Sequence, residues 1–477
     1  MENCKNLKCL PNSIQMKSLE SLNLSGCEKL ENFPEIRGNM EFLSELMLSR
    51  TAIQELPSSV GQLIGISLLD LSSCRNLVTL PASIYEMRKL KILNLKGCSK
   101  LATFPENLGD LGQLEEVNAS NTAIWQLPDS FGNLSKLRIL SLKRGWKLKH
   151  QSAGSLIFPK SFGCLKELKI LDLSGCNLSG EEINAFSCLT ALLELNLSRN
   201  EFIFLPDSIS QLSQLQYLNL TYCLALIELP KLPPSIEELY VEDFLAPQAI
   251  LALPMYPRLY LVSFTNYSFV QQPYTEKSND NSALEKILCL VLSDAMDNVV
   301  HPSLNSDHRV SYCIVFPERA IPTWFKYQSN EEKISFKLPK FWCSPEFMGF
   351  AICCVTCMGA GIHGCDLRLS GKYDYTFIEA KLICNNHPEE LEVLEKVCKV
   401  GSSSRSYSLC VCLAYIPLYS LLEGLGTKIK NFNQYGVFEA SIQRRIPRQW
   451  GVHLIYKSGR QFFRSRLHDG LLGHQLR

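Results

Sequence analysis

The stretch LESLNLSGC, from Leu19 to Cys27, decides the fold of the first half of the chain. Leu22 and Leu24 alternate with polar residues, so a short strand here has one apolar and one polar face. The Leu-x-x-Leu-x-Leu pattern recurs, with its last position at Leu24, Leu48, Leu71, Leu95, Ala119, Leu142, Leu173, Leu197, Leu220 and Val241. Successive spacings are 24, 23, 24, 24, 23, 31, 24, 23 and 21 residues. A unit this short cannot bury its own apolar face, so the units must stack on each other.

This period predicts a leucine-rich-repeat α/β solenoid, a horseshoe with parallel strands on its concave face. Two further positions recur in each unit. The turn after the strand carries a side chain that can meet buried backbone groups, namely Cys27, Thr51, Cys74, Cys98, Thr122, Cys176, Asn200 or Cys223. A Leu-Pro or Phe-Pro pair follows, and its proline predicts an irregular or short helical return on the convex side.

Composition excludes several classes of protein. The chain has 477 residues and a net charge of +1, so its charge does not point to nucleic acid or acidic lipid as a partner. Its first residues lack the apolar run of a secretory signal, and no apolar stretch is long enough to span a membrane. The 20 cysteines form no paired pattern. We therefore predict reduced, buried thiols and a cytoplasmic location, with a nuclear one left open.

A concave solenoid surface binds macromolecules far more often than it does chemistry. We predict a partner-binding groove of mixed apolar and amide character, formed by Asp70, Ile92, Asn94, Asn118, Ile139, Ile170, Asp172, Asn196, Tyr217, Asn219 and Tyr240. The alternative is that the amides only solvate the sheet.

One repeat carries an insertion, because 31 residues separate Leu142 from Leu173. No acidic residue occurs from Ser130 to Lys166, and a tryptophan lies among the basic residues. An exposed tryptophan with basic neighbours is typical of an interface hot spot. We predict that it binds an acidic protein surface or another domain through Lys143, Arg144, Trp146, Lys147 and Lys149. The alternative is a solvated loop without a partner.

The second half of the chain has a different pattern. Ser282–Met296 has apolar residues at helical spacing. Seven segments then read as strands: YCIVF (312–316), KISFKL (333–338), MGFAICCVT (348–356), YTFIEAKLIC (375–384), YSLCVCLAYI (407–416), YGVFEASI (435–442) and WGVHLIY (450–456). Many strands with few helices predict a mainly antiparallel β-sandwich.

Two motifs in this half suggest chemistry. Gly359–Gly364 matches the dinucleotide pattern Gly-x-Gly-x-x-Gly, but the next residues alternate like a strand instead of opening a helix. A zinc-like set is formed by Cys354, Cys357, His363 and Cys365, although residues three apart on a strand face opposite ways. No other catalytic motif occurs. We predict no catalytic residue, no metal and no cofactor.

The segments LNLSGCEKLENFPEI and LLDLSSCRNLVTLPASI resemble the repeats of plant intracellular TIR-type nucleotide-binding leucine-rich-repeat disease resistance proteins. The alternation of Ser-Gly-Cys units with Thr-Ala-Ile units strengthens this likeness. The second half resembles the C-terminal jelly-roll/Ig-like domain (C-JID) of that family. The matching motif residues are Pro317, Ile321, Pro322, Trp324 and Phe325. Glu318 and Tyr267 depart from the pattern, which often has Gly and Cys there.

The resemblance implies a sensor. In that family the repeats and the sandwich grip a pathogen effector, a nucleotide-binding domain then oligomerises the receptor, and the TIR domains cleave NAD. The expected function is therefore effector recognition and control of receptor activation in plant defence. The nucleotide-binding and TIR domains of the same or a partner receptor are the other expected partners. Neither module is found in this chain, so no enzymatic activity is expected.

The predicted domains are a solenoid of about ten repeats (1–245), a linker (246–281), a jelly-roll/Ig-like sandwich with an N-terminal helix (282–456) and a basic tail (457–477). The chain opens inside a repeat, so we expect the solenoid to be truncated at its N-terminus. The alternative functions are a stand-alone regulator or decoy of another receptor, and an inactive gene fragment.

Overall fold

The chain forms two compact units, Met1–Pro234 and Ser235–Arg477. The computed structural model describes residues 1–38, 40–145, 154–242, 261–265, 312–316, 321, 324–359, 376–384, 391–400, 407–417, 435–442 and 447–456. The predicted helix at Ser282–Met296 and the basic tail lie outside these residues. Among the described residues, no helix combines the length and apolar character needed to cross a membrane.

The first unit is a leucine-rich-repeat solenoid, as predicted. Its parallel sheet contains β2 (Ser21–Asn23), β4 (Glu45–Met47), β5 (Leu68–Asp70), β6 (Ile92–Asn94), β7 (Glu116–Asn118), β8 (Ile139–Ser141), β9 (Ile170–Asp172), β10 (Glu194–Asn196) and β11 (Tyr217–Asn219). Neighbouring strands pair without slippage, so that Leu93 faces Leu69 on one side and Val117 on the other. A separate parallel pair is formed by β1 (Ser13–Ile14) and β3 (Glu35–Ile36).

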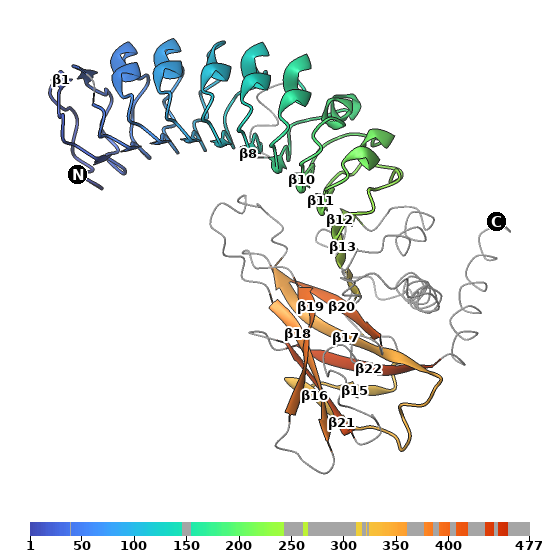
Figure 1. Cartoon of the computed structure of the whole chain (residues 1–477). Helices are drawn as coiled ribbons and strands as arrows, with labels where there is room; N and C mark the ends of the chain where they lie inside the picture. Colours follow the sequence, from blue (N-terminus) through green and yellow to red (C-terminus); the bar gives the residue numbers. More distant parts are fainter. Residues whose placement is uncertain are drawn as a thin grey trace, which may run out of the picture. The chain divides into compact units, whose positions relative to one another are not determined.

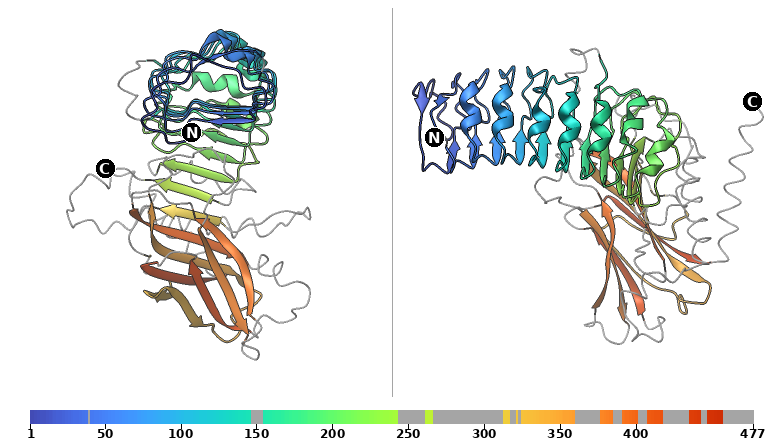
Figure 2. Two further views of the ribbon diagram at one scale, coloured as in Figure 1. Left: turned by 90° about the vertical axis from the view of Figure 1, so that its left-hand side faces the viewer. Right: turned by 45° about the horizontal axis from the view of Figure 1, so that its top comes forward.

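Short 3-10 helices form the opposite side of the solenoid (Figures 1 and 2). They are η1 (Ser58–Gln62), η2 (Ala82–Glu86), η3 (Leu108–Asp110), η4 (Asp129–Asn133), η6 (Lys160–Cys164), η7 (Glu181–Phe186) and η8 (Asp207–Gln211). A proline with extended backbone, such as Pro57 or Pro81, precedes five of these helices. The ring fixes φ and removes a donor, so the chain leaves the sheet there and turns into a helix. The predicted convex return is thus confirmed.

A ladder of small polar side chains fills the turns between the sheet and the convex side. The Cys74 thiol donates to the Leu48 carbonyl (3.1 Å), and Cys98 donates to Leu71 (3.1 Å). Asn200 Nδ2 donates to two carbonyls, those of Leu173 (3.1 Å) and Leu197 (2.7 Å). The bonds to Leu48, Leu71 and Leu173 reach a carbonyl of the preceding repeat, and the bond to Leu197 stays within the same repeat. The predicted structural role of this position is therefore confirmed.

The second unit is built from longer strands. They are β12 (Glu238–Glu242), β13 (Leu261–Thr265), β14 (Tyr312–Phe316), β15 (Tyr327–Ser329), β16 (Lys333–Lys337), β17 (Phe347–Gly359), β18 (Thr376–Cys384), β19 (Leu391–Val400), β20 (Tyr407–Pro417), β21 (Tyr435–Ile442) and β22 (Gln449–Tyr456). All seven predicted segments are strands, and the sequence pattern did not indicate β13, β15 and β19. Except for the parallel β12–β13 and β13–β14 pairs, the pairings are antiparallel.

These strands form two layers that enclose an aromatic core. Within this unit, one layer has the neighbour order β12-β13-β14-β20-β17-β22-β15, which is part of a longer sheet, and the other layer is a four-stranded sheet of order β16-β21-β18-β19. Trp342 is 2% exposed, and its indole N–H donates to the Tyr435 carbonyl at 2.9 Å. Its ring lies 5.0 Å from Phe347 and 5.4 Å from Phe350, between centroids. This tryptophan joins a strand of each sheet, which fits its large buried apolar area.

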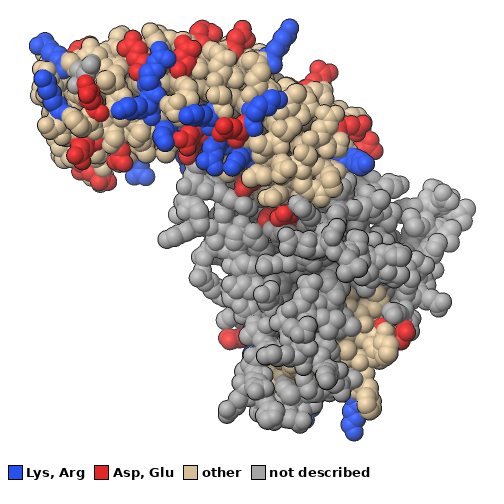
Figure 3. All heavy atoms as spheres, in the orientation of Figure 1, with Lys and Arg blue, Asp and Glu red and all other residues tan. Residues whose placement is uncertain are grey.

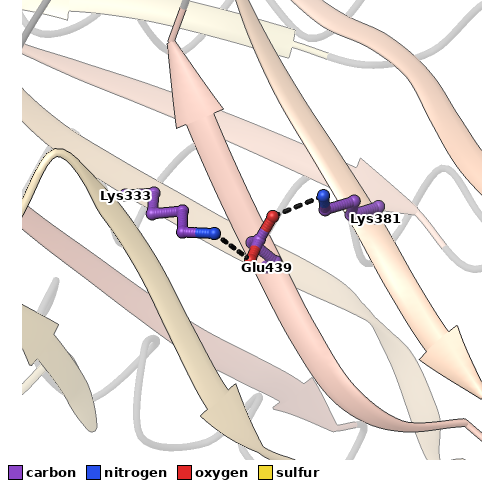
Figure 4. Close-up of polar contacts among 3 residues, drawn as sticks. All are labelled: Lys333, Lys381 and Glu439. Atoms are coloured by element: carbon purple, nitrogen blue, oxygen red, sulfur yellow. Dashed lines mark hydrogen bonds and ion pairs between the residues drawn. The ribbon is translucent and has the colours of Figure 1, made fainter. Parts of the chain in front are cut away.

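Three strands of the smaller sheet share one ion-pair cluster (Figure 4). The carboxylate of Glu439 on β21 accepts hydrogen bonds from Lys333 on β16 (2.8 Å) and Lys381 on β18 (2.5 Å). Burial raises the pKa of the Glu439 carboxyl, but the hydrogen bonds and charges of the two lysines outweigh burial and hold this pKa below its ordinary value. The carboxylate is therefore ionised at neutral pH in the folded protein.

Candidate protein-binding surface

The predicted amide column occupies the last residue of each solenoid strand. Asp70, Asn94 and Asn118 face each other in register on β5, β6 and β7. Each side-chain Oδ1 accepts a hydrogen bond from the backbone N–H two residues further on, at 2.9, 3.2 and 3.1 Å respectively. Asp172, Asn196 and Asn219 form the same bond. The column therefore caps the turn that leaves each strand, a structural role that the sequence analysis did not assign.

Burial divides this column. Asp70 and Asn94 are half-buried. Asn118 is 8%, Asp172 1%, Asn196 6% and Asn219 0% exposed, so these four side chains present little surface in this structure, and their contact with a partner stays a prediction. Burial also raises the pKa of the Asp172 carboxyl, because desolvation outweighs the nearby Lys143 charge and the hydrogen bonds that it accepts. Tyr240 on β12 is 7% exposed, and its hydroxyl donates to Glu238 at 3.0 Å.

A second column, at the first residue of each strand, retains accessible side chains. Ile92, Ile139, Ile170 and Tyr217 are all half-buried on the concave strands. Three carboxylates that the sequence analysis overlooked belong to the same column, those of Glu45, Glu116 and Glu194. Glu116 lies in register between Ile92 and Ile139, and Glu194 lies between Ile170 and Tyr217. Comparing the same position in every repeat would have revealed all three.

The environment of Glu116 is apolar for a carboxylate. Its register neighbours are isoleucines, and desolvation raises its pKa. A partly desolvated carboxylate on a concave surface disfavours the close approach of another anion.

The insertion begins at a buried arginine. Arg144 is 6% exposed, and its guanidinium donates to the carbonyls of Ile124 (2.6 Å) and Gly154 (3.4 Å). This side chain is used inside the solenoid, and its predicted contact with a partner stays a prediction. In the sequence, the basic residues around the insertion look like a solvated loop. Nothing in the sequence indicates that Arg144 is the one whose side chain is buried. Lys143 is half-buried, while Trp146, Lys147 and Lys149 lie outside the described residues.

The other end of the insertion is also fixed. The Ser155 hydroxyl donates to Glu182 Oε1 at 2.5 Å, and the Ile157 N–H donates to the Trp125 carbonyl at 2.9 Å. Glu182 Oε2 accepts bonds from the backbone N–H groups of Ser179 and Gly180. These contacts tie the chain after the insertion to the preceding and the following repeat.

In the second unit, residues of the motif that resembles the C-JID family pattern pack in the core. Ile321 is 6% and Phe325 2% exposed. Both lie against Gly451 on β22, where an added Cβ would come within 2.8 Å of Ile321 Cγ2 and 3.1 Å of Phe325 Cβ. Trp324 stacks on Phe325 with ring centroids 4.4 Å apart. Ile321 and Phe325 are therefore packing residues. Pro317 and Pro322 lie outside the described residues.

The two motifs with possible chemistry fall mostly outside the described residues. Gly361, His363 and Cys365 are not among them, and Cys354 is buried in β17. Within the part of the chain that the structure describes, no three His, Cys, Asp or Glu side chains converge on a point where a metal ion could bind.

Comparison with known proteins matches three segments of the chain. Residues 316–461 match the C-JID domain, 2–157 match a leucine-rich repeat region, and 166–224 match a leucine rich repeat. TMV resistance protein N of Nicotiana glutinosa is 30% identical over 475 residues, which cover 96% of this chain and 38% of that protein. Disease resistance-like protein CSA1 of Arabidopsis thaliana is 33% identical over 72% of this chain and 23% of its own length. Disease resistance protein RPS4B of the same plant is 28% identical over 74% of this chain and 25% of its own length.

The fold and these matches define a leucine-rich-repeat protein with a C-JID domain. The chain belongs to the TIR-type nucleotide-binding leucine-rich-repeat disease resistance proteins. It spans less than two fifths of the length of each of these relatives.

Proposed function

We propose that this chain is the recognition region of a plant immune receptor, and that it binds a pathogen effector protein through the first column of its concave strands. The observation that carries the proposal is the row of half-buried Ile92, Ile139, Ile170 and Tyr217 on a regular parallel sheet. Accessible apolar side chains with polar neighbours are typical of protein interfaces. The names of the relatives, which include resistance to a virus, support a role in pathogen recognition.

The proposal also covers how this region acts with the other domains of a receptor. Matches to repeats and a C-JID domain favour binding over catalysis for this part of the chain. The nucleotide-binding and TIR domains of the same or another receptor are its proposed internal partners, and effector contact would control their activation in the cytoplasm.

The test measures binding of the whole chain to a panel of secreted effector proteins from plant pathogens. The double variant Ile139→Glu/Ile170→Glu places two charges in the column and should weaken a bound effector at least ten-fold. The control variant Val78→Glu/Leu224→Glu changes two side chains that are 49% and 64% exposed on other parts of the solenoid. Thermal unfolding checks that both variants fold. An effector that binds both variants as tightly as the unchanged chain would overturn the proposal.

A further inference from the structure

A row of cations borders the concave sheet on the side where the chain enters each strand. Figure 3 shows Lys and Arg side chains gathered over the middle repeats of the solenoid. We call this row the basic edge; its members are Lys89, Lys91, Lys136, Arg138, Lys166 and Lys169. All are exposed except Lys169, which is half-buried. The basic sequence run is therefore divided, because Arg144 turns inward while Lys136, Arg138 and Lys166 join this edge.

The basic edge adjoins the apolar column. Lys91, Arg138 and Lys169 directly precede Ile92, Ile139 and Ile170 on β6, β8 and β9. Backbone hydrogen bonds link the edge positions of neighbouring repeats, from Arg138 N–H to Glu115 (2.8 Å) and from Lys169 N–H to Arg138 (2.9 Å). Neighbouring edge positions are therefore one strand apart, about 4.8 Å. A ligand that packs on the isoleucines meets these cations at its border.

The cations of the basic edge differ in whether a neighbouring residue of the chain already pairs with their charge. Lys91 forms an ion pair with Glu115 at 3.2 Å, Lys136 donates to Gln113 at 2.7 Å, and Lys166 donates to the Cys188 carbonyl at 2.9 Å. Arg138 and Lys169 form no ion pair with another described residue. These two neighbouring charges are the strongest anion-attracting part of the edge.

The carboxylates near the edge decide which class of anion fits. Glu115 and Glu167 interrupt the row of cations, and Glu116 lies in the adjoining column. A nucleic acid strand presents phosphates at every step and is favoured by an uninterrupted cationic groove with aromatic stacking platforms. An interrupted basic edge beside an apolar column is suited to a protein segment with both apolar and acidic side chains.

We infer that the basic edge, centred on Arg138 and Lys169, binds an acidic protein segment whose apolar side chains pack on Ile139 and Ile170. This inference rests on the proposed function, because it names the chemistry of the partner at the same concave surface. Glu116 sets the limit of the acidic contact, since a partner carboxylate placed over it would be repelled.

The test uses a fluorescent twelve-residue peptide of repeating Glu-Leu-Glu-Ser, and fluorescence anisotropy measures its affinity for the whole chain. The variant Arg138→Glu/Lys169→Glu should bind about ten-fold more weakly, because two attractions become repulsions. The control variant Lys29→Glu/Lys100→Glu has the same change in net charge. Both of its lysines are exposed and only donate to asparagines, Asn6 and Asn76. This control should bind with unchanged affinity.

A variant with the opposite expected sign strengthens the design. Glu116→Gln removes a repulsive carboxylate and should tighten peptide binding about two- to three-fold. Equal weakening by the edge and control variants would overturn the inference, and so would an unchanged chain that does not bind the peptide. Tighter binding of single-stranded oligo-dT than of the peptide would overturn it in favour of nucleic acid.

The effector panel separates this inference from the proposed function. If the effector is lost in Ile139→Glu/Ile170→Glu but bound normally by Arg138→Glu/Lys169→Glu, the inference fails and the proposed function stands. If both variants bind the effector normally, both fail. Loss in both variants, with normal binding by the two controls, supports both.

Discussion

The two units of this protein both bury one face of a sheet, but they do so over very different distances along the chain. In the solenoid, Leu93 pairs with residues 24 positions away on each side, at Leu69 and Val117. In the second unit, Cys353 pairs with Leu413, 60 residues away, and with Gly451, 98 residues away. The stability of a solenoid is approximately a sum of neighbour interactions. The sandwich brings distant segments together and should respond to a change as one body.

The largest expected effect is a break in the sandwich. Trp342→Ala removes the indole that joins β21 to the Phe347 and Phe350 cluster, and should lower the free energy of unfolding by about 3–5 kcal/mol. Urea unfolding followed by near-ultraviolet circular dichroism measures this change. The matched control is the adjacent Phe341→Ala, whose ring is 79% exposed and should matter by less than about 0.5 kcal/mol. Similar losses in both variants would contradict the assigned core.

A comparable deletion in the solenoid should act locally. Leu140→Ala on β8 removes a side chain with 0% exposure and should cost about 2–5 kcal/mol. Because each repeat contacts only its neighbours, the faster hydrogen exchange should be confined to the repeats around β7, β8 and β9. Mass spectrometry of exchanged peptides tests this. Faster exchange spread evenly over the whole solenoid would show that its repeats unfold as one cooperative body.

A smaller effect tests the turn ladder of the solenoid. Asn200→Ala leaves the carbonyls of Leu173 and Leu197 without their side-chain donor, and should cost about 1–3 kcal/mol. Asn200→Cys should cost less, because Cys98 and Cys176 make the corresponding bond in other repeats. Thermal unfolding of the two variants ranks them. A cysteine variant that is less stable than the alanine variant would refute the shared role.

The smallest effect concerns pH and the ion-pair cluster of the sandwich. The pKa of Glu439 is lower in the folded protein than its ordinary value of 4.5, so the unfolded chain binds the proton more readily. The stabilising contribution is therefore present above about pH 4.5 and is lost as the pH falls through the lowered pKa. Glu439→Gln should flatten this dependence of the unfolding free energy, measured by urea titrations at several pH values. An unchanged acid slope in this variant would contradict the cluster's contribution.

The sequence predicted what depends on short spacings. Leucines 24 residues apart specify strands, and small turn residues specify the ladder, because both involve neighbours in the same or the next repeat. Hydrogen bonds and packing contacts that depend on the folded path of the chain could not be predicted from the sequence. The inward turn of Arg144 depends on two carbonyls, one from the preceding repeat, that no local pattern reveals. The capping bonds of Asp70 and Asn94 were overlooked because an amide on a strand equally suggests a binding surface.

The second unit illustrates the same limit. Gly451 must remain without a side chain because Ile321 and Phe325 lie against it, and these residues are 126 or more positions away in the sequence. A motif recognised by resemblance identified both partners, but only the folded structure shows that they serve packing. Resemblance thus located the important residues, and packing decided their role.

Chemical labelling of the turn-ladder cysteines would report when each repeat of the solenoid opens. Burial raises the pKa of Cys98 and Cys176 to about 12, so neither presents a reactive thiolate while its repeat is closed. Cys4, Cys9, Cys164 and Cys188 are exposed on the same solenoid. An alkylating reagent would therefore modify these exposed cysteines at once and the ladder cysteines only as each repeat opens. The order in which the ladder cysteines are labelled would show from which end the solenoid unfolds.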